Sequence, residues 1–221
     1  NIYNLMQGGL TLGAKDYYLN NDAATVAIRE AYKTYLNKMF QLYGFSAEDA
    51  AKKASAVFLH ETTLATFSKS RTELRDPQAN YNKMTLAEFK ENYPNIPLEA
   101  LANGEGIKSE YLKEMIVGQP AFFAGYDKVA AAECAGTLKA LMEWDIIKSS
   151  ASYLSDEIRE ARFEFFGKTM SGRKEDYPLW KRATAQVEAQ LGEALGRIYC
   201  KRYFPESSKK MMETLVKNLQ I

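Results

Sequence analysis

Two stretches in the first third of the chain carry apolar residues at the three- and four-residue spacing of an amphipathic helix. They cover about residues 22–43 and 46–67. Gly44 stands where a helix stop is expected, and Ser46 precedes Asp49 by three residues, which is the spacing of an N-terminal cap. The pattern therefore predicts a hairpin of two helices.

The middle of the chain mixes short apolar runs with breakers. Thr85 and Glu88 have the spacing of a capping box and predict a short helix that reaches Tyr93. Residues 114–119 are apolar with two β-branched members and form the only strand candidate. The stretch between them is expected to be irregular because it holds Pro94, Pro97, Gly104 and Gly106.

Apolar periodicity resumes at Pro120, a favoured first residue of a helix, and predicts helices through Tyr153 and over residues 155–166. Residues 167–177 are polar and predict a loop. Pro178 then opens a long helix that passes Tyr199. We therefore expect a mainly all-α, multi-helix domain with at most a short strand pair.

The last predicted helix covers residues 207–221 and carries Met212, Leu215 and Leu219 on one face. No Gly, Asn or Pro stop follows it, and the chain starts at Asn1 without an initiator Met or a signal-type segment. We expect residues 1–221 to be a single helical domain that is truncated at both ends.

Composition excludes several classes of protein. With 46% hydrophobic and 26% charged residues, 221 residues are enough for a packed core. A net charge of +1 leaves no basic field for nucleic acid, and charges interrupt every apolar stretch before the roughly 20 residues of a membrane span. We expect no nucleic-acid partner and no membrane span in this segment.

Two cysteines, Cys134 and Cys200, are too few for a zinc-finger pattern or a multi-bridge framework. They form either one disulfide or two buried thiols. Since both lie in apolar-periodic stretches, we favour two buried, unbridged thiols.

His60 and Glu61 begin like the zinc-peptidase motif, in which two histidines one helical turn apart bind the metal. Leu64 occupies the place of the second histidine, and His60 is the only histidine of the chain. We therefore interpret His60 as a histidine on a helix face and expect Glu61 to pair with a nearby Lys or Arg.

Two other patterns have structural interpretations. Glu157, Glu160 and Glu164 lie on neighbouring turns, but the interleaved Arg159 and Arg162 indicate a solvated, salt-linked face rather than a metal site. The glycine-rich residues 8–13 lack the Lys-Ser/Thr of a phosphate loop and predict turns.

No serine or cysteine has a histidine in a position that suggests a nucleophile and its base. The aromatic residues, 14 Tyr and 11 Phe, fall mostly at helical spacing and are expected in the core rather than on a ligand platform. We nominate no catalytic and no metal-binding residue and expect no cofactor in this segment.

Several motifs in the same order nevertheless resemble one family across essentially the whole chain. Gly8-Gly9-Leu10-x-Leu12-Gly13-x-x-Asp16-Tyr17-Tyr18-Leu19 is similar to the segment before the first long helix of the N-terminal domain in the neprilysin and endothelin-converting-enzyme family. Collinear matches follow at Glu61-Thr62-x-Leu64-Ala65, Arg75-Asp76-Pro77, Tyr81-Asn82-Lys83-Met84-Thr85-Leu86, Gln119-Pro120, Tyr153-Leu154-Ser155, Phe163-x-Phe165-x-Gly167-Lys168-Thr169-x-Ser171-Gly172, Trp180-Lys181-Arg182 and Leu191-Gly192-Glu193-Ala194-Leu195-Gly196-x-x-Tyr199.

The resemblance implies the non-catalytic helical lobe of a zinc metallo-endopeptidase. Such a lobe closes over a downstream thermolysin-like domain that carries the zinc and the catalytic residues, and the enclosed chamber admits peptides but not folded proteins. The implied partners are the chain's own catalytic domain and peptide substrates. The segment alone is expected to be inactive.

The low cysteine count and the lack of an Asn-x-Ser/Thr site favour a bacterial member of the family, with an extracytoplasmic, periplasmic or lipid-anchored location by resemblance. The alternative function is a stand-alone helical protein-interaction module without catalysis. A histidine pair encoded downstream of residue 221 favours the peptidase lobe, and a stop codon there favours the module.

Overall fold

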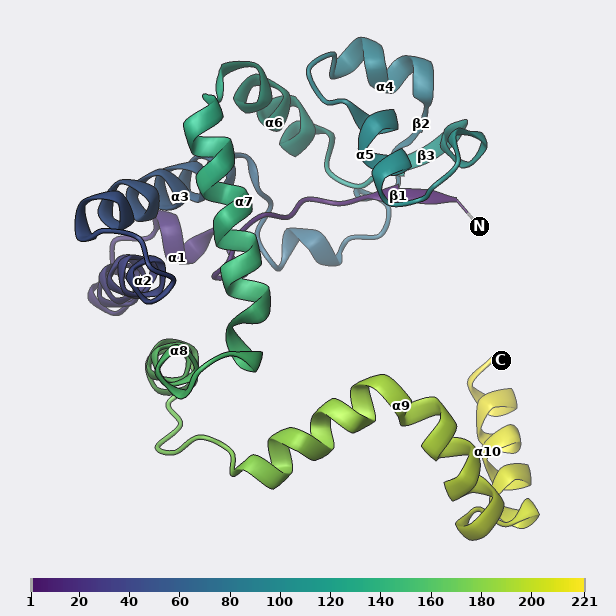
Figure 1. Ribbon diagram of the computed structural model, residues 1–221. Helices are drawn as coiled ribbons and strands as arrows, with labels where there is room; N and C mark the ends of the chain where they lie inside the picture. The colour runs from purple at the N-terminus through teal and green to yellow at the C-terminus, as the bar shows by residue number, and fades with distance from the viewer. Residues whose placement is uncertain (1, 221) are drawn as a thin grey trace. The chain divides into compact units, whose positions relative to one another are not determined.

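The computed structural model describes residues 2–220. The chain divides into two compact units, an N-terminal unit (Asn1–Arg173) and a C-terminal unit (Lys174–Ile221) (Figure 1). The N-terminal unit contains a small sheet and the helices α1 (Asp16–Leu19), α2 (Ala23–Leu42), α3 (Ala47–Phe67), α4 (Leu86–Asn92), α5 (Leu98–Gly104), α6 (Pro120–Ala132), α7 (Ala135–Ser150) and α8 (Asp156–Arg162). Helices dominate, which confirms the predicted fold class.

The predicted helical hairpin is α2 and α3. The Asp22 side chain accepts a hydrogen bond from the Thr25 N–H at the start of α2, and the Ser46 hydroxyl accepts one from the Asp49 N–H at the start of α3. Gly44 connects the helices with a φ of 95°, which lies in the left-handed region that glycine tolerates. Local capping and turn signals thus fix the hairpin.

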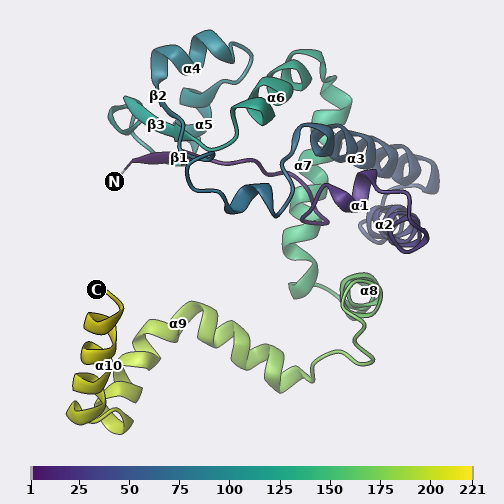
Figure 2. The ribbon, with the colours of Figure 1, turned by 180° about the vertical axis from the view of Figure 1, so that it is seen from behind.

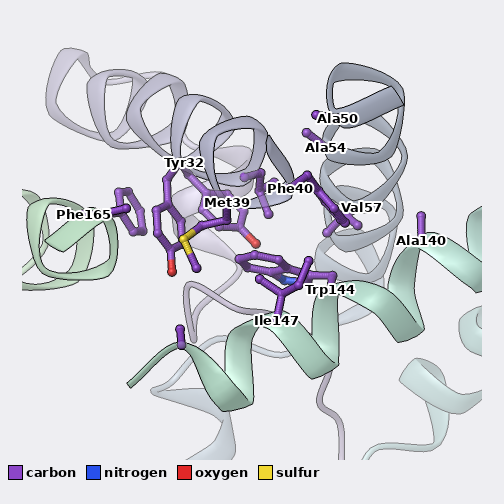
Figure 3. Packing of buried hydrophobic residues seen from close by; sticks show 14 of the residues in the cluster. Tyr32, Met39, Phe40, Ala50, Ala54, Val57, Ala140, Trp144, Ile147 and Phe165 are labelled. Atoms are coloured by element: carbon purple, nitrogen blue, oxygen red, sulfur yellow. The ribbon is translucent and has the colours of Figure 1, made fainter. Parts of the chain in front are cut away.

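The main hydrophobic core lies where α2, α3 and α7 meet (Figure 3). Large side chains of α2, among them Tyr32, Met39 and Phe40, have no exposed surface. Trp144 and Ile147 of α7 cover them, and Phe165 closes the end of the cluster beside Tyr32. Each such side chain contributes roughly 1.5–3 kcal/mol through burial. The predicted core role of the aromatic residues is confirmed in this unit.

A three-stranded sheet packs with α4, α5 and α6 around a second core cluster. Its strands are β1 (Tyr3–Leu5), β2 (Lys83–Thr85) and β3 (Glu114–Val117), in the order β1-β3-β2. β1 runs parallel to β3, and β2 runs antiparallel to it. The expectation of at most a strand pair is therefore wrong. Of the three strands, only β3 was predicted, because three-residue strands are too short to show alternation.

The sheet with α4 and α5 lies at one end of the N-terminal unit and α2 lies at the other, as the two opposite views show (Figures 1 and 2). The extended segment after β1 leads from the sheet back to α1.

A buried glutamine, Gln119, holds this segment in place through hydrogen bonds. Its amide oxygen accepts the Gln7 N–H at 2.7 Å, and its amide nitrogen donates to Asn80 Oδ1 at 3.0 Å.

Some predicted boundaries are wrong. α5 lies inside the stretch that was expected to be irregular, with Pro97 as its N-cap. The helix expected from Pro120 onward breaks at Glu133 and Cys134, whose backbones are extended. After α8 the helix widens into a π-helical segment over Phe163–Thr169, so the expected loop at residue 167 starts later. Gly167 makes this possible, because a Cβ there would lie 2.2 Å from the Phe163 ring.

The C-terminal unit consists of α9 (Leu179–Tyr203) and α10 (Glu206–Leu219). Pro178 caps the start of α9, as predicted, and Phe204 and Pro205 separate the two helices. Residue 221, the last of the predicted final helix, lies outside the described residues. No helix within residues 2–220 combines the length and the apolarity that a membrane span requires.

Candidate functional site

His60 lies on α3, as predicted, and pairs with a carboxylate at the end of α6. Its Nδ1 is 2.7 Å from Glu133 Oε2, and the two side chains are only 10% and 18% exposed. Glu133 is the C-terminal cap residue of α6. The pair therefore ties α3 to α6, and the interpretation of His60 as a structural histidine agrees with this geometry.

Glu61 points in the other direction, into the aromatic core, and is 3% exposed. The Thr11 hydroxyl donates to its Oε1 at 2.6 Å, and the hydroxyls of Tyr18 and Tyr32 donate to its Oε2 at 2.7 and 2.8 Å. The expectation that Glu61 pairs with Lys or Arg is wrong. The physical reason is that three hydroxyl donors, the half-buried Thr11 and the buried Tyr18 and Tyr32, already satisfy the carboxylate.

These contacts join four parts of the N-terminal unit. Thr11 comes from the glycine-rich turn, Tyr18 from α1, Tyr32 from α2 and Glu61 from α3. Thr11 also accepts a hydrogen bond from the Trp144 indole N–H of α7 at 3.2 Å. We call these five residues the Glu61 network. It fixes the N-terminal segment against the hairpin, which is a structural task.

A sequence signal for the burial of Glu61 exists. The buried positions of α3 follow helical spacing through Ala50, Ala54, Val57 and Leu64, and Glu61 occupies the step between the last two. A carboxylate in an apolar stripe must find donors inside the protein. Which donors it finds is a matter of tertiary structure.

Burial raises the pKa of the Glu61 carboxyl, although the hydroxyls of Thr11, Tyr18 and Tyr32 oppose this shift. Burial, together with the Glu61 charge, also raises the pKa of Tyr18 and Tyr32 well above their usual range. Both phenols therefore stay protonated and act as donors.

The raised pKa of Glu61 predicts a pH-dependent effect of Glu61→Gln. Folding favours the protonated carboxyl, so its contribution to stability is complete below the unfolded-state pKa of about 4.3 and is lost as pH rises through the folded-state pKa. The stability difference between wild type and variant should therefore fall with rising pH, by at most about 1.4 kcal/mol per pH unit. Urea unfolding from pH 4 upward measures it; a difference that grows with pH would contradict the shift.

The residues present do not fit a zinc site. Zinc needs three or four nitrogen, sulfur or carboxylate ligands. Over residues 2–220, no group of three or more His, Cys, Asp or Glu side chains is placed to hold a metal ion. Glu157, Glu160 and Glu164 are exposed, and Arg159 and Lys168 pair with carboxylates along this face, which confirms the solvated, salt-linked interpretation.

We predict that the 221-residue chain binds less than about 0.1 equivalent of zinc after dialysis, because His60 and Glu133 alone offer too few ligands. Metal analysis by mass spectrometry measures this. Zinc retained near one equivalent, and lost on His60→Ala, would overturn the prediction.

The glycine-rich residues 8–13 form turns, as predicted. Gly9 and Gly13 have φ values of 83° and 76°, and the Gly13 N–H donates to the Leu10 carbonyl at 3.0 Å. A Cβ on Gly9 would lie 2.9 Å from the Leu64 side chain. This tight path brings Thr11 to Glu61.

The two cysteines are exposed, free thiols, so their expected burial is wrong. Cys134 sits at the N-cap of α7, outside the core, and Cys200 lies on α9, none of whose residues is buried. Cys134 Sγ is 3.3 Å from the Thr137 hydroxyl, and this hydrogen bond lowers the pKa of the Cys134 thiol.

We predict that both thiols react with an alkylating reagent in the native chain. Thr137→Val should slow alkylation of Cys134 about two- to threefold at neutral pH, because it removes the hydrogen bond that favours the thiolate. Cys200 serves as the internal control and should keep its rate. Peptide mass spectrometry over a time course gives both rates, and protection of either thiol in native protein would contradict the exposed placement.

Helices α9 and α10 of the C-terminal unit expose many large apolar side chains. The stripe predicted on the last helix is exposed, with Met212 at 50%, Leu215 at 49% and Leu219 at 78%. α9 likewise exposes Trp180, Val187, Leu191, Leu195 and Ile198. Helices of this length are stabilised mainly by packing of an apolar face. These exposed apolar faces are suited to contact with another part of a protein.

Comparisons with known proteins point to one family. The model of "Peptidase family M13" matches residues 1–221. Bovine (Bos taurus) endothelin-converting enzyme 1 is 27% identical over 98% of this chain, and the endothelin-converting enzyme homolog of Locusta migratoria is 25% identical over 99%. The chain spans only 29% and 31% of the length of these two proteins.

Solved structures of a bacterial protein show the same fold. The zinc metalloprotease Zmp1 of Mycobacterium tuberculosis in its open state superimposes with a TM-score of 0.87 and 29% identity over 98% of this chain. Zmp1 in complex with an inhibitor gives a TM-score of 0.89 at the same identity. The chain covers 33% and 32% of these two structures.

Proposed function

The chain belongs to peptidase family M13, and from this membership we propose that residues 1–221 form the non-catalytic helical lobe of a longer zinc metallo-endopeptidase. The observation that carries the proposal is the match of the whole chain to about one third of Zmp1, a zinc metalloprotease. The absence of a metal-binding group from residues 2–220 supports a division of labour in which the zinc and the catalytic residues lie outside this segment.

The lobe's proposed task is to enclose and gate the substrate chamber, so that peptides enter and folded proteins do not. Two observations support it. Zmp1 has been solved in an open and in a partial open state, and this chain superimposes on both, with TM-scores of 0.87 and 0.80. The exposed apolar faces of α9 and α10 also suit contact with the proposed partner, the chain's own catalytic domain.

The test requires the longer protein encoded by the parent gene. We expect it to hydrolyse a quenched fluorescent peptide, to lose this activity when zinc is chelated, and to leave a folded protein substrate intact. The 221-residue chain, assayed in parallel, should be inactive. If the natural chain has no peptidase activity and no segment after residue 221, the proposal fails and the stand-alone interaction module replaces it.

The resemblance to this family also carries a proposal about location. We propose that the parent is a bacterial protein that works outside the cytoplasm, in the periplasm or on a lipid anchor. Fractionation of the source cells, with a cytoplasmic marker and a periplasmic marker as controls, tests this location. Recovery of the protein with the cytoplasmic marker would contradict it.

A further inference from the structure

Helix α7 is apolar on two opposite faces. Its inward face carries Ala140, Trp144 and Ile147, each 2% exposed, toward α2 and α3 (Figure 3). Its opposite face carries Leu138, Met142 and Ile146, which are 48%, 69% and 64% exposed. The last three follow each other at four-residue steps and therefore line up along about 12 Å of the helix. We call these three residues the α7 ridge.

A surface helix usually buries one apolar face and exposes polar residues on the opposite face, so a second apolar face on α7 is unusual. Two pairs of charged residues accompany the α7 ridge along the helix. Lys139 lies 4.0 Å from Glu143, and Asp145 pairs with Lys148 at 3.0 Å. Charged residues around an apolar centre are the usual arrangement of an interface. The α7 ridge therefore has the composition of a contact surface.

The size of the α7 ridge bears on what covers it. A stable interface between separate chains buries about 800 Å² on each partner, far more than three side chains on 12 Å of helix supply. A segment of the same polypeptide needs no such area, because its covalent connection keeps its effective concentration high. The relatives are more than three times as long as this chain, so they contain ample sequence for such a segment.

We propose that the α7 ridge is the docking surface for a helix of the longer protein that lies outside residues 1–221. The proposal rests on the function proposed above. Side chains at four-residue steps form a ridge that fits the groove between the side-chain rows of a second helix. The occupant is accordingly an apolar helix face, and Met142, at the centre of the α7 ridge, is its main contact.

Cysteine accessibility tests the proposal. Met142→Cys and Ile146→Cys are introduced separately into the 221-residue chain and into the longer protein, and alkylation at each position is followed by peptide mass spectrometry. We expect alkylation to be at least about tenfold slower in the longer protein, because the site must first open. Lys52→Cys is the matched control. The Lys52 side chain is 69% exposed on α3 and should react equally in both proteins.

The outcomes separate this proposal from the proposed function. Equal alkylation of Met142→Cys in both proteins, with peptidase activity in the longer one, overturns the docking surface and leaves the peptidase lobe intact. Protection already present in the 221-residue chain also overturns the proposal. If that protection rises with protein concentration, a second copy is the occupant.

Discussion

Replacing Glu61 with alanine is expected to lower the free energy of unfolding of the chain by about 3–5 kcal/mol. The substitution removes the common acceptor of the Thr11, Tyr18 and Tyr32 hydroxyls. Each buried donor left without a partner costs about 1–3 kcal/mol, and local rearrangement recovers part of the sum. Urea unfolding followed by far-ultraviolet circular dichroism measures the loss.

Two control substitutions test whether the loss comes from the hydrogen bonds of Glu61. Glu61→Gln keeps the shape of the side chain and one acceptor oxygen, so it should cost less than Glu61→Ala. Glu48→Gln changes a carboxylate of the same helix whose side chain is 78% exposed, and it should stay within about 0.5 kcal/mol of wild type. A loss below about 1 kcal/mol for Glu61→Ala would show that the Glu61 network does not hold the N-terminal segment in place.

The hairpin of α2 and α3 and the short helix α4 were predictable because their signals are local. The spacing of apolar residues in α2 and α3, the caps at Asp22 and Ser46 and the stop at Gly44 all act within a few residues. The capping box of α4 is likewise present in full, with Thr85 and Glu88 each bonding the other's backbone N–H. Each of these local signals agrees with the observed structure, so the sequence was sufficient to predict these three helices.

The sheet was not predictable in the same way. β1 and β2 have three residues each, and both gain their hydrogen bonds from β3, which is far away in sequence from β1. Tyr3 pairs with Met115, and no feature of the sequence around Tyr3 predicts that partner. A strand that exists through pairing across more than 100 residues leaves no periodic trace in a three-residue window.

The Glu61 network lies between these two cases. The apolar stripe of α3 places Glu61 on the buried face, and the spacing of apolar residues in the sequence is enough to predict this burial. Its donors come from residues 11, 18 and 32, and only the tight turn at residues 8–13 brings the first of them within reach. The sequence predicted a Lys or Arg partner for Glu61, because exposed carboxylates on helices usually pair with basic residues. This rule does not apply to a carboxylate that is buried among apolar side chains.

The exposed cysteines show the opposite error. Apolar periodicity around Cys200 indicated a buried face, yet no residue of α9 is buried. The periodic pattern indicates which face of the helix is suited to contact with another apolar surface. The same holds for the α7 ridge and for the stripe on α10.

Trp144→Ala is the second substitution with a large expected effect, a loss of about 3–5 kcal/mol in the free energy of unfolding. The indole is 2% exposed and packs between the rings of Tyr35 and Phe40, at centroid distances of 5.8 and 6.0 Å. Its N–H also donates to the Thr11 hydroxyl. Removal leaves a cavity at the junction of α2, α3 and α7 that the packed neighbours fill only in part.

The only other tryptophan of the chain supplies the control. Trp180 is 65% exposed, so Trp180→Ala should change stability by no more than about 0.5 kcal/mol, and equal losses for the two variants would contradict the placement of Trp144 in the core. Trp144→Phe then separates the two contributions. It keeps most of the ring contacts but removes the donor to Thr11, and a cost of about 1–2 kcal/mol is expected. If Trp144→Phe costs as much as Trp144→Ala, the hydrogen bond to the Glu61 network outweighs the packing. If it costs nothing, Thr11 is held by Glu61 alone and α7 contributes to the core solely through contact area.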